Sequence, residues 1–292
     1  MTSQSTCTTC PYCGTGCGVL ATPDGSGGLT VKGDPKHPAN FGQLCSKGSA
    51  LGETISTKGR LLEPQIRNRS ANWETALNLV AEKFRTTIAE HGSDSVAFYV
   101  SGQLLTEDYY VANKLMKGYI GSGNIDTNSR LCMASTVAGH KRAFGTDTVP
   151  GNYEDLELAD LVILTGSNLA WCHPVLYQRV ATAKAARPTM KVVVIDPRRT
   201  ATCDLADMHL AIQPGTDVAL FNHLLNQTHA MGAINMKWVS NSVSGLSEVL
   251  DKSRNTDVAV TGLSQAQLSE LSELWIKTEK SVTVFSQGVN QS

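Results

Sequence analysis

The sequence has almost no net charge and no long apolar run. Its 292 residues contain 25 lysines and arginines against 26 aspartates and glutamates, for a net charge of −1. A dedicated nucleic-acid-binding protein needs a basic excess to neutralise phosphates, so that function is not expected. No uninterrupted apolar run approaches the length of a membrane-spanning helix. We therefore expect neither a nucleic acid nor a membrane as a partner.

An export signal is also missing from the sequence. A secretory signal has a basic region followed by an apolar segment. The first residues, Met-Thr-Ser-Gln-Ser-Thr, contain neither. The pair Arg198-Arg199 lies too deep in the chain to act as a twin-arginine signal. These absences predict a cytoplasmic protein, in which the eight cysteines remain thiols rather than disulfides.

Five of those cysteines lie near the start of the chain. Four occur in Cys7-Thr-Thr-Cys10-Pro-Tyr-Cys13-Gly-Thr-Gly-Cys17-Gly18, and the fifth is Cys45. Thiolates are soft ligands that select zinc, copper(I) or iron–sulfur clusters. Three closely spaced cysteines and one distant cysteine are typical of a single [4Fe–4S] cluster. The interspersed glycines let the backbone fold closely around such a cluster.

The run also fits the spacing of two-cluster ferredoxins, whose fourth cysteine binds a second cluster. That interpretation expects a second run and a proline after the last cysteine, but Gly18 follows Cys17 and no second run exists. We therefore predict Cys10, Cys13, Cys17 and Cys45 as the ligands and Cys7 as a spare. A structural zinc site on the same residues is the alternative.

The sequence as a whole predicts an α/β fold in three parts. Residues 1–63 form the cluster module, 64–138 an incomplete α/β domain, and 139–292 a dinucleotide-binding-like α/β domain. In the second part, Asn72 is expected to cap a helix that ends at Gly92. A turn-rich loop there leads to Cys132 at the start of a further helix. A lone cysteine is usually a buried apolar residue, although a helix N-terminus beside Arg130 would favour its thiolate.

In the third part, apolar strands alternate with helices, as in a doubly wound, Rossmann-like parallel sheet. The expected strands are Leu161–Thr165, Lys191–Ile195, His209–Ile212 and Val282–Phe285. Polar turns follow them at 166–168, 196–198, 215–217 and 287–291. Ligands bind beyond the carboxyl ends of such strands, so these turns indicate a nucleotide site, with Asp196 suited to a ribose or base edge. Ordinary connecting loops are the alternative.

Because the pattern stops at Ser292 without a closing helix, we expect an N-terminal fragment of a longer chain.

Three segments carry a resemblance to a known family. The segments Cys-Pro-Tyr-Cys-Gly-Thr-Gly-Cys-Gly, Leu-Cys-Ser-Lys-Gly and Asn-Ser-Arg-Leu-Cys-Met-Ala-Ser resemble those of molybdopterin oxidoreductases. These enzymes carry molybdenum bis(molybdopterin guanine dinucleotide). Within the family the likeness is to assimilatory and periplasmic nitrate reductases, and the missing export signal favours the cytoplasmic, assimilatory kind.

The resemblance implies a role for each matching residue. Cys10, Cys13, Cys17 and Cys45 would bind the [4Fe–4S] cluster, and Lys47 would lie between cluster and pterin. Cys132 would ligate molybdenum. Residues at the pterin would be Gln103 and Asn128. Residues at the guanine dinucleotide would be Thr165, Gly166, Ser167, Asn168, Asp196, Arg198, Gly215, Thr216, Asp217, Gln287 and Gln291. Position 287 is Gln where relatives commonly have Met, which weakens that one contact, and His173 is expected to be structural.

The implied activity is the two-electron reduction of nitrate to nitrite. The electron donor would be ferredoxin, flavodoxin or an NADH-dependent flavoprotein, and Arg130 is a candidate for attracting the nitrate anion. Formate dehydrogenase of the same superfamily is one alternative, but those enzymes have His after the metal-binding cysteine or selenocysteine, whereas Met133 follows Cys132. A second alternative is an electron-transfer subunit without molybdenum. Cys132 and the intact strand-end turns argue against it.

Overall fold

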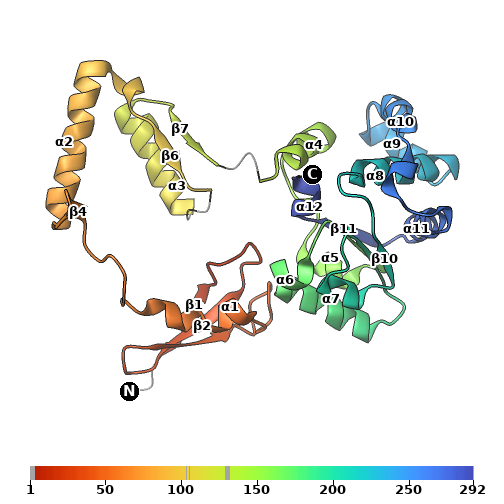
Figure 1. Ribbon diagram of the computed structural model, residues 1–292, viewed down its shortest axis with the longest axis horizontal. Helices are drawn as coiled ribbons and strands as arrows, with labels where there is room; N and C mark the ends of the chain where they lie inside the picture. The colour runs from red at the N-terminus through yellow and green to blue at the C-terminus, as the bar shows by residue number, and fades with distance from the viewer. Residues whose placement is uncertain (1–3, 103, 105, 129–131, 292) are drawn as a thin grey trace. The chain divides into compact units, whose positions relative to one another are not determined.

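The computed structural model describes residues 4–102, 104, 106–128 and 132–291, which form two compact units (Figure 1). The first unit comprises Met1–Thr54 and Ser135–Ser292, and the second comprises Ile55–Ala134. The first unit therefore contains both the cysteine-rich segment and the predicted dinucleotide-binding region. The predicted domain boundaries after residues 63 and 138 remain predictions.

The N-terminal part of the first unit is a small antiparallel sheet. Its strands are β1 (Thr6–Thr9), β2 (Gly18–Pro23) and β3 (Leu29–Gly33), in the order β1-β2-β3. The short helix α1 (Ser46–Ser49) and a 3₁₀-helix (Leu51–Ile55) follow. Because β1 pairs with β2 from Thr6↔Ala21 to Thr9↔Gly18, the segment between them is a tight connection carrying three cysteines.

The described residues of the second unit form two small strand pairs and four helical segments. Its elements are β4 (Gln65–Ile66), β5 (Arg69–Ser70), α2 (Trp73–His91), a 3₁₀-helix (Ser93–Ser95), β6 (Phe98–Val100), α3 (Thr106–Asn113), a π-helix (Lys114–Ile120) and β7 (Ile125–Thr127). Asn72 caps α2 as predicted, accepting a hydrogen bond from the Thr75 N–H at 2.8 Å, and Gly92 ends the helix with φ of 81°. The 3₁₀-helix that follows leads into β6.

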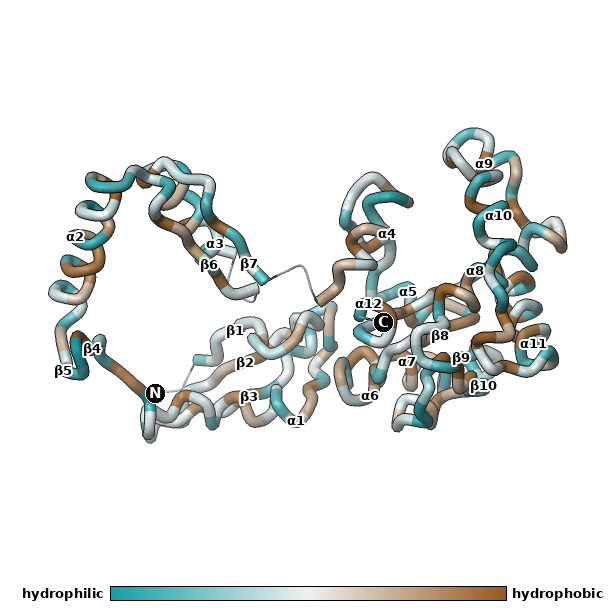
Figure 2. The backbone as a smooth tube through the Cα atoms, turned by 45° about the horizontal axis from the view of Figure 1, so that its top comes forward, coloured by the Kyte–Doolittle hydropathy of each residue, from teal (hydrophilic) through white to brown (hydrophobic). Residues whose placement is uncertain are grey.

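The long helix α2 carries apolar residues, coloured brown in Figure 2, and several of them are exposed. Leu77 and Val80, at helical spacing, are 60% and 49% exposed. Phe84 packs against Phe98 of β6 with ring centroids 6.0 Å apart. The periodicity correctly predicts the helix, but within this unit only part of its apolar face is buried.

The second half of the first unit is a four-stranded parallel sheet. The strands β8 (Leu161–Thr165), β9 (Lys191–Ile195), β10 (Met208–Leu210) and β11 (Ser281–Phe285) lie in the order β10-β9-β8-β11. The helices are α4 (Ala134–Phe144), α5 (Tyr153–Leu158), α6 (Leu169–Cys172), α7 (Pro174–Ala186), α8 (Asp217–Ala230), α9 (Met236–Ser242), α10 (Leu246–Arg254), α11 (Gln265–Lys277) and α12 (Gln287–Asn290), with 3₁₀ turns at Ala201–Leu205 and Val258–Thr261.

Two hydrophobic cores cover the two faces of this sheet. Val162, Leu164 and Val194 pack with residues of α5 and α7 on one face. Ile163 and Val193 pack with α8 and α11 on the other. Alternate residues of a strand point to opposite faces, so a strand buried on both faces is mainly apolar, as β8 is up to its last residue, Thr165. The predicted doubly wound α/β architecture is thereby confirmed.

The strand order also locates a topological switch point. The chain passes from β8 to β9 to β10 in one direction and then returns to place β11 on the other side of β8. In doubly wound sheets, ligands bind beyond the carboxyl ends of the strands where the order reverses. In this protein that point lies between β8 and β11.

Candidate functional site

The connection between β1 and β2 carries Cys10, Cys13 and Cys17. The Cys10 N–H donates to the Cys17 carbonyl oxygen at 2.8 Å, which closes the loop at its base. The Gly16 N–H donates to the Cys13 carbonyl oxygen at 3.2 Å, and Gly16 has φ of 67°. This left-handed conformation favours glycine, and it lets the chain turn back toward Cys17 within a few residues.

Asn40 joins this loop to the segment that carries Cys45. Its side chain is 1% exposed. Its Oδ1 accepts from the Gly18 N–H at 2.8 Å, and its Nδ2 donates to the carbonyl oxygens of Gly18 at 3.1 Å and Gln43 at 2.8 Å. Gly18 follows Cys17 directly, and Gln43 lies two residues before Cys45. The role of Asn40 is not predictable from its local sequence, in which the turn-forming Pro-Ala-Asn-Phe-Gly is the only signal.

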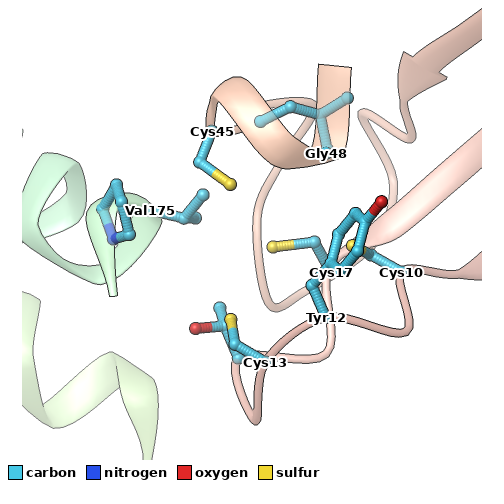
Figure 3. Close-up of a pocket in the computed structure, with 10 residues that line it drawn as sticks. Cys10, Tyr12, Cys13, Cys17, Cys45, Gly48 and Val175 are labelled. Carbon is cyan, nitrogen blue, oxygen red and sulfur yellow. The ribbon is translucent and has the colours of Figure 1, made fainter. Parts of the chain in front are cut away.

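The four predicted cluster ligands line one common pocket (Figure 3). Cys10, Cys13 and Cys17 come from the first loop, and Cys45 precedes α1. Pro174 and Val175, at the start of α7, line the same pocket. Cys7 lies in β1, is exposed and is not among the lining residues. The structure thus brings together the four cysteines predicted as ligands and leaves the predicted spare outside.

The arrangement of these thiols suits a cluster better than a single ion. A tetrahedral zinc ion requires all its sulfur ligands at about 2.3 Å from one point. Across the described residues, no three His, Cys, Asp or Glu side chains converge closely enough to hold a metal ion. Cysteines spread around a pocket wall instead match a four-iron cube, in which each thiolate binds its own corner.

The Cys17 thiol shows how strongly this pocket disfavours uncompensated charge. Burial first, and then the nearby Cys13, Cys10 and Cys45, raise the pKa of Cys17 from 9.0 to about 11. Four adjacent thiolates therefore require a positively charged group to stabilise them. Iron in a cluster supplies that charge.

Tyr153 of α5 holds the cysteine loop from the α/β side of the unit. Its hydroxyl donates to the carbonyl oxygens of Gly14 at 3.1 Å and Thr15 at 3.3 Å. Burial raises the pKa of Tyr153 above 10.0, and Cys13 and Cys17 add to this effect. The hydroxyl therefore keeps its proton at neutral pH and remains a donor.

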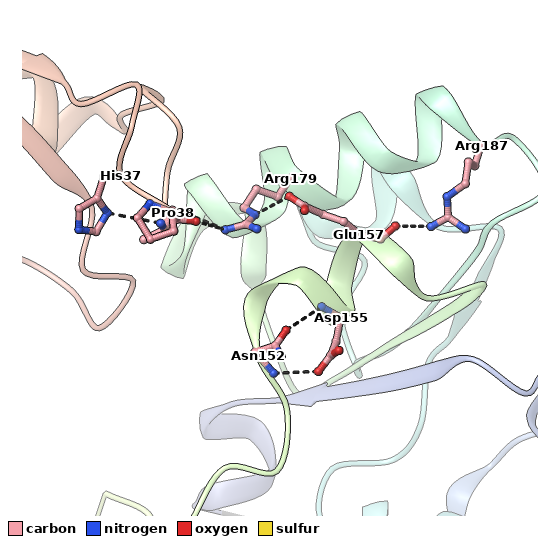
Figure 4. A network of polar contacts seen from close by, with 8 residues as sticks. His37, Pro38, Asn152, Asp155, Glu157, Arg179 and Arg187 are labelled. Atoms are coloured by element: carbon pink, nitrogen blue, oxygen red, sulfur yellow. Dashed lines mark hydrogen bonds and ion pairs between the residues drawn. The ribbon is translucent and has the colours of Figure 1, made fainter.

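Arg179 of α7 makes a second connection between the α/β part of this unit and its N-terminal part (Figure 4). Its Nη1 donates to the carbonyl oxygens of Pro38 at 2.9 Å and Ala39 at 3.0 Å, and its Nε donates to Glu157 at 2.6 Å. The guanidinium lies 5.1 Å from the Phe41 ring centroid and 5.6 Å from that of Tyr153. Sequence reasoning missed both Tyr153 and Arg179, because no local pattern distinguishes them from ordinary helix residues.

Lys47 lies in α1, two residues after Cys45. Its side chain is exposed, and its Nζ lies 5.5 Å from the ring centroid of Tyr12, which lines the cysteine pocket. The predicted lysine is therefore beside the pocket and in contact with one of its aromatic walls.

Three of the predicted nucleotide-binding turns meet at the carboxyl end of β8. Thr165 Oγ1 donates to the Asp217 carboxylate at 3.1 Å, and both side chains are buried. Gly166 has φ of 54°, and a Cβ there would lie 2.7 Å from the Cα of Gly288. The Gly288 N–H donates to the Gly166 carbonyl oxygen at 3.0 Å. The segments after β8 and β11 thus pack backbone to backbone at the switch point.

The segment 287–291 differs from its prediction as a turn. Residues 287–290 form the one-turn helix α12, in which the Val289 and Asn290 N–H groups donate to the Ser286 carbonyl oxygen. This one-turn helix also packs Gly288 against Gly166. Gln287 and Gln291 are exposed at the two ends of this helix.

The other predicted nucleotide residues are distributed around the same strand ends. The Asp196 Oδ1 accepts from the Arg198 N–H at 2.8 Å, and the Arg198 side chain is exposed. Asn168 Oδ1 accepts from Thr202 Oγ1 at 3.1 Å, Ser167 is buried, and Thr216 Oγ1 donates to the Gln213 carbonyl oxygen. Gly215 is exposed in the turn before α8. His173 precedes α7, and burial lowers its pKa below 6.5.

The remaining predicted residues belong to the second unit. Asn128 directly follows β7 and is exposed; a Cβ at Gly102, just beyond β6, would lie 2.3 Å from its Oδ1. Because β6 and β7 are parallel neighbours, their carboxyl ends lie at the same edge. Cys132 is an exposed free thiol. Gln103 and Arg130 lie outside the described residues.

Comparisons with known proteins agree with this architecture. Residues 60–291 match the family Molybdopterin oxidoreductase, and residues 3–57 match the Molybdopterin oxidoreductase Fe4S4 domain. A nitrate reductase of Klebsiella oxytoca is 53% identical over 98% of this chain and 33% of its own length. A nitrate reductase of Shewanella frigidimarina is 45% identical over 97% of this chain and 32% of its own length.

Two further relatives complete the comparison. A periplasmic nitrate reductase of Desulfovibrio desulfuricans is 45% identical over 74% of this chain and 29% of its own length. The solved structure of acetylene hydratase from Pelobacter acetylenicus superposes with a TM-score of 0.82, covering 97% of this chain and 40% of that one. At 21% identity this likeness concerns the fold alone.

The chain spans about a third of the length of the nitrate reductases of Klebsiella oxytoca and Shewanella frigidimarina. Among the described residues, no helix is both long and apolar enough to cross a bilayer. The matched families confirm the expected [4Fe–4S] cluster and molybdopterin cofactor. With the cysteine pocket, the doubly wound sheet and matches along both parts of its sequence, this chain belongs to the molybdopterin oxidoreductase family.

Proposed function

We propose that this chain is part of a nitrate reductase catalytic subunit, which reduces nitrate to nitrite with two electrons and two protons. The observation that carries the proposal is the 53% identity to a nitrate reductase over 98% of the chain. The residue after Cys132 supports it further, because Met133 stands where formate dehydrogenases have His.

The cysteine pocket is assigned to the [4Fe–4S] cluster, with Cys10, Cys13, Cys17 and Cys45 as its ligands. Their common pocket and the charge repulsion among their thiols support this ligand set. Lys47, whose Nζ lies 5.5 Å from the ring centroid of Tyr12, is assigned to the electron path between the cluster and the pterin. When bound, the cluster supplies electrons and the molybdenum centre supplies oxygen-atom transfer.

The molybdenum cofactor is assigned its bis(molybdopterin guanine dinucleotide) form. The Cys132 thiolate would be the protein ligand to molybdenum, with Gln103 and Asn128 at the pterin and Arg130 attracting nitrate. Around β8 and β9, the buried Asp196 is oriented by the Arg198 N–H and can accept hydrogen bonds from a ribose or base edge. The Thr165–Asp217 hydrogen bond fixes the start of α8 against the same strand end. The residues at these turns assigned to the guanine dinucleotide are Thr165, Gly166, Ser167, Asn168, Asp196, Arg198, Gly215, Thr216, Asp217, Gln287 and Gln291.

We further propose an assimilatory role in the cytoplasm, with ferredoxin, flavodoxin or an NADH-dependent flavoprotein as the electron donor. All eight cysteines are free thiols, which suits a reducing compartment. Fractionation of cells into cytoplasm and periplasm tests the compartment. Recovery of the protein in the periplasm would contradict the cytoplasmic location. The Desulfovibrio desulfuricans relative is named a periplasmic nitrate reductase.

The decisive test of the function is Cys132→Ser in the full-length enzyme. The change replaces a soft thiolate with a hard, weakly acidic hydroxyl, which is a poorer ligand for molybdenum. Nitrate reduction should fall by orders of magnitude while the iron content stays unchanged. Cys7→Ser, which changes an exposed thiol outside the cysteine pocket, is the control and should retain activity.

The same experiment separates the competing functions. A formate dehydrogenase would oxidise formate in its unaltered form and lose that activity in Cys132→Ser. An electron-transfer subunit would show only a modest loss of stability. Undiminished nitrate reduction by Cys132→Ser would rule out a molybdenum ligand at this residue.

A further inference from the structure

Thr15 has a buried hydroxyl that no part of the described protein satisfies. The residue lies between Cys13 and Cys17, is 4% exposed, and lines the cysteine pocket. Its Oγ1 is buried and has no hydrogen-bond partner, the neighbouring sulfur atoms included. Buried side-chain hydroxyls in native proteins nearly always have a partner, so this exception requires an explanation.

The protein offers this hydroxyl little opportunity to find a partner by moving. The Thr15 carbonyl oxygen and the adjacent Gly14 carbonyl oxygen both accept from the Tyr153 hydroxyl. The Gly16 N–H on the other side donates to the Cys13 carbonyl oxygen. These bonds fix the main chain around Thr15, so the residue keeps its place in the pocket wall.

The other walls of the pocket provide few acceptors. Apart from the cysteines and Tyr12, the pocket is lined by Leu44, Gly48, Pro174 and Val175, whose side chains are apolar or absent. Since none of these side chains offers an acceptor and Thr15 Oγ1 has no partner among the described residues, the group that fills the pocket is left to supply one. In a [4Fe–4S] cluster, the available acceptors are sulfur atoms.

We propose that Thr15 Oγ1 donates a hydrogen bond to a sulfur atom of the bound [4Fe–4S] cluster and thereby raises the reduction potential of the cluster. The inference rests on the proposed ligand set. Reduction adds one negative charge, part of which resides on the sulfur atoms. A donor directed at them therefore stabilises the reduced cluster more than the oxidised one.

Thr15→Val tests this role, because valine keeps the branched shape of threonine and removes only the donor. The cluster-loaded protein would be titrated anaerobically with dithionite, with the reduced cluster measured by EPR. A hydrogen bond to a charged acceptor changes an equilibrium by about tenfold. At a fixed potential the ratio of reduced to oxidised cluster should therefore fall about tenfold, which is about 59 mV for a one-electron couple.

Thr9→Val is the matched control. It makes the same chemical change beside Cys10, at an exposed position of β1 that does not line the pocket. Its potential should equal that of the unaltered protein. A potential that falls equally in both variants would overturn the proposal, and so would an unchanged potential in Thr15→Val with four irons bound.

Two more variants test the proposal if Thr15→Val does not take up a cluster. Thr15→Ser retains the hydroxyl and should keep the original potential, whereas Thr15→Ala should lower it. Equal potentials in the serine and alanine variants would overturn the hydrogen bond while leaving the ligand set intact. If the unaltered protein takes up no four-iron cluster, the ligand set itself fails, and this inference fails with it.

Discussion

At the scale of single residues, Arg179 shows how a buried charge can join two parts of a unit. The side chain is 6% exposed, and its Nη2 has no protein partner. Its remaining donors bond Glu157 and the carbonyl oxygens of Pro38 and Ala39. The planar guanidinium also lies between the rings of Phe41 and Tyr153. A compact ammonium group cannot provide this combination of directed donors and flat stacking faces.

We therefore predict that Arg179→Lys lowers the free energy of unfolding by about 2–3 kcal/mol, because carbonyl oxygens and a carboxylate lose their partners. Arg254→Lys is the control, since Arg254 is 55% exposed and makes one ion pair with Asp251. That change should cost about 0–1 kcal/mol. Urea unfolding of both variants measures the difference. Equal losses of unfolding free energy in the two variants would mean that the Arg179 contacts stabilise the fold no more than an exposed ion pair does.

Residue roles differ in how far local sequence reveals them. The cysteine spacing predicts four thiols that the structure gathers around one pocket, and Asn72 is recognisable as a cap from the residues that follow it. The role of Asn40, in contrast, depends on Gly18, which belongs to another loop. Such partnerships arise from the fold and leave no periodic or compositional pattern in the sequence.

At the scale of elements, the strands β8 and β9 begin and end at the residues predicted from sequence. A short apolar run bounded by polar residues defines such buried strands. The segment 287–291 was predicted as a turn and is instead the helix α12. Its conformation depends on contact with Gly166, a residue far away in the sequence, which no local rule includes.

The contact between Gly166 and Gly288 makes a specific prediction. A Cβ at Gly288 would lie 2.5 Å from the Cα of Gly166, and a backbone atom cannot yield as a flexible side chain does. Gly288→Ala should lower the free energy of unfolding by about 1–3 kcal/mol through this overlap. Gly139→Ala in α4 is the control. A Cβ there would meet nothing within 4 Å, so the change should be neutral or stabilising by about 0.5–1 kcal/mol. A tolerated Gly288→Ala would show that α12 can move away from β8 at little cost.

Asp207 connects three elements and makes the stability of the sheet depend on pH. It lies just before β10, accepts from the Val192 N–H of β9 at 2.8 Å and pairs with Lys184 of α7. Partial burial acts to raise the pKa of Asp207. The hydrogen bonds from Lys184 and Val192, with the charges of Lys184 and Lys191, outweigh burial and lower it below 3.8.

A lowered pKa in the folded state means that the ionised carboxylate stabilises the fold above pH 3.8. That stabilisation is lost as the pH falls below 3.8 through the folded-state pKa. Asp207→Asn should therefore be less stable at pH 7 by about 1 kcal/mol. The difference between the two proteins should shrink in the acid range. Urea unfolding measured between pH 7 and pH 2.5 tests this, and a difference that stays constant with pH would contradict it.

At the scale of the whole first unit, the cysteine pocket combines segments that are distant in sequence. Cys10, Cys13 and Cys17 follow β1, Cys45 precedes α1, and Pro174 and Val175 belong to α7. A cluster bound by all four thiolates would cross-link the two loops against the α/β part of the unit. A group that binds only the folded protein stabilises it by mass action, so cluster loading and folding should be coupled.

Cys7 and Cys45, which lie on either side of the Cys10–Cys17 run in the sequence, provide a matched test of that coupling. Cys45→Ala removes one corner ligand from the pocket, whereas Cys7→Ala removes an exposed thiol that does not line it. After anaerobic reconstitution, Cys7→Ala should bind about four irons and four sulfides, as one cubic cluster requires. Its melting temperature should exceed that of its own cluster-free form. Cys45→Ala should bind little iron, and reconstitution should leave its melting temperature unchanged. Loss of the cluster in Cys7→Ala together with full loading in Cys45→Ala would reverse the roles of these two cysteines, and the cluster would then lie toward β1 instead of between the loops and α7.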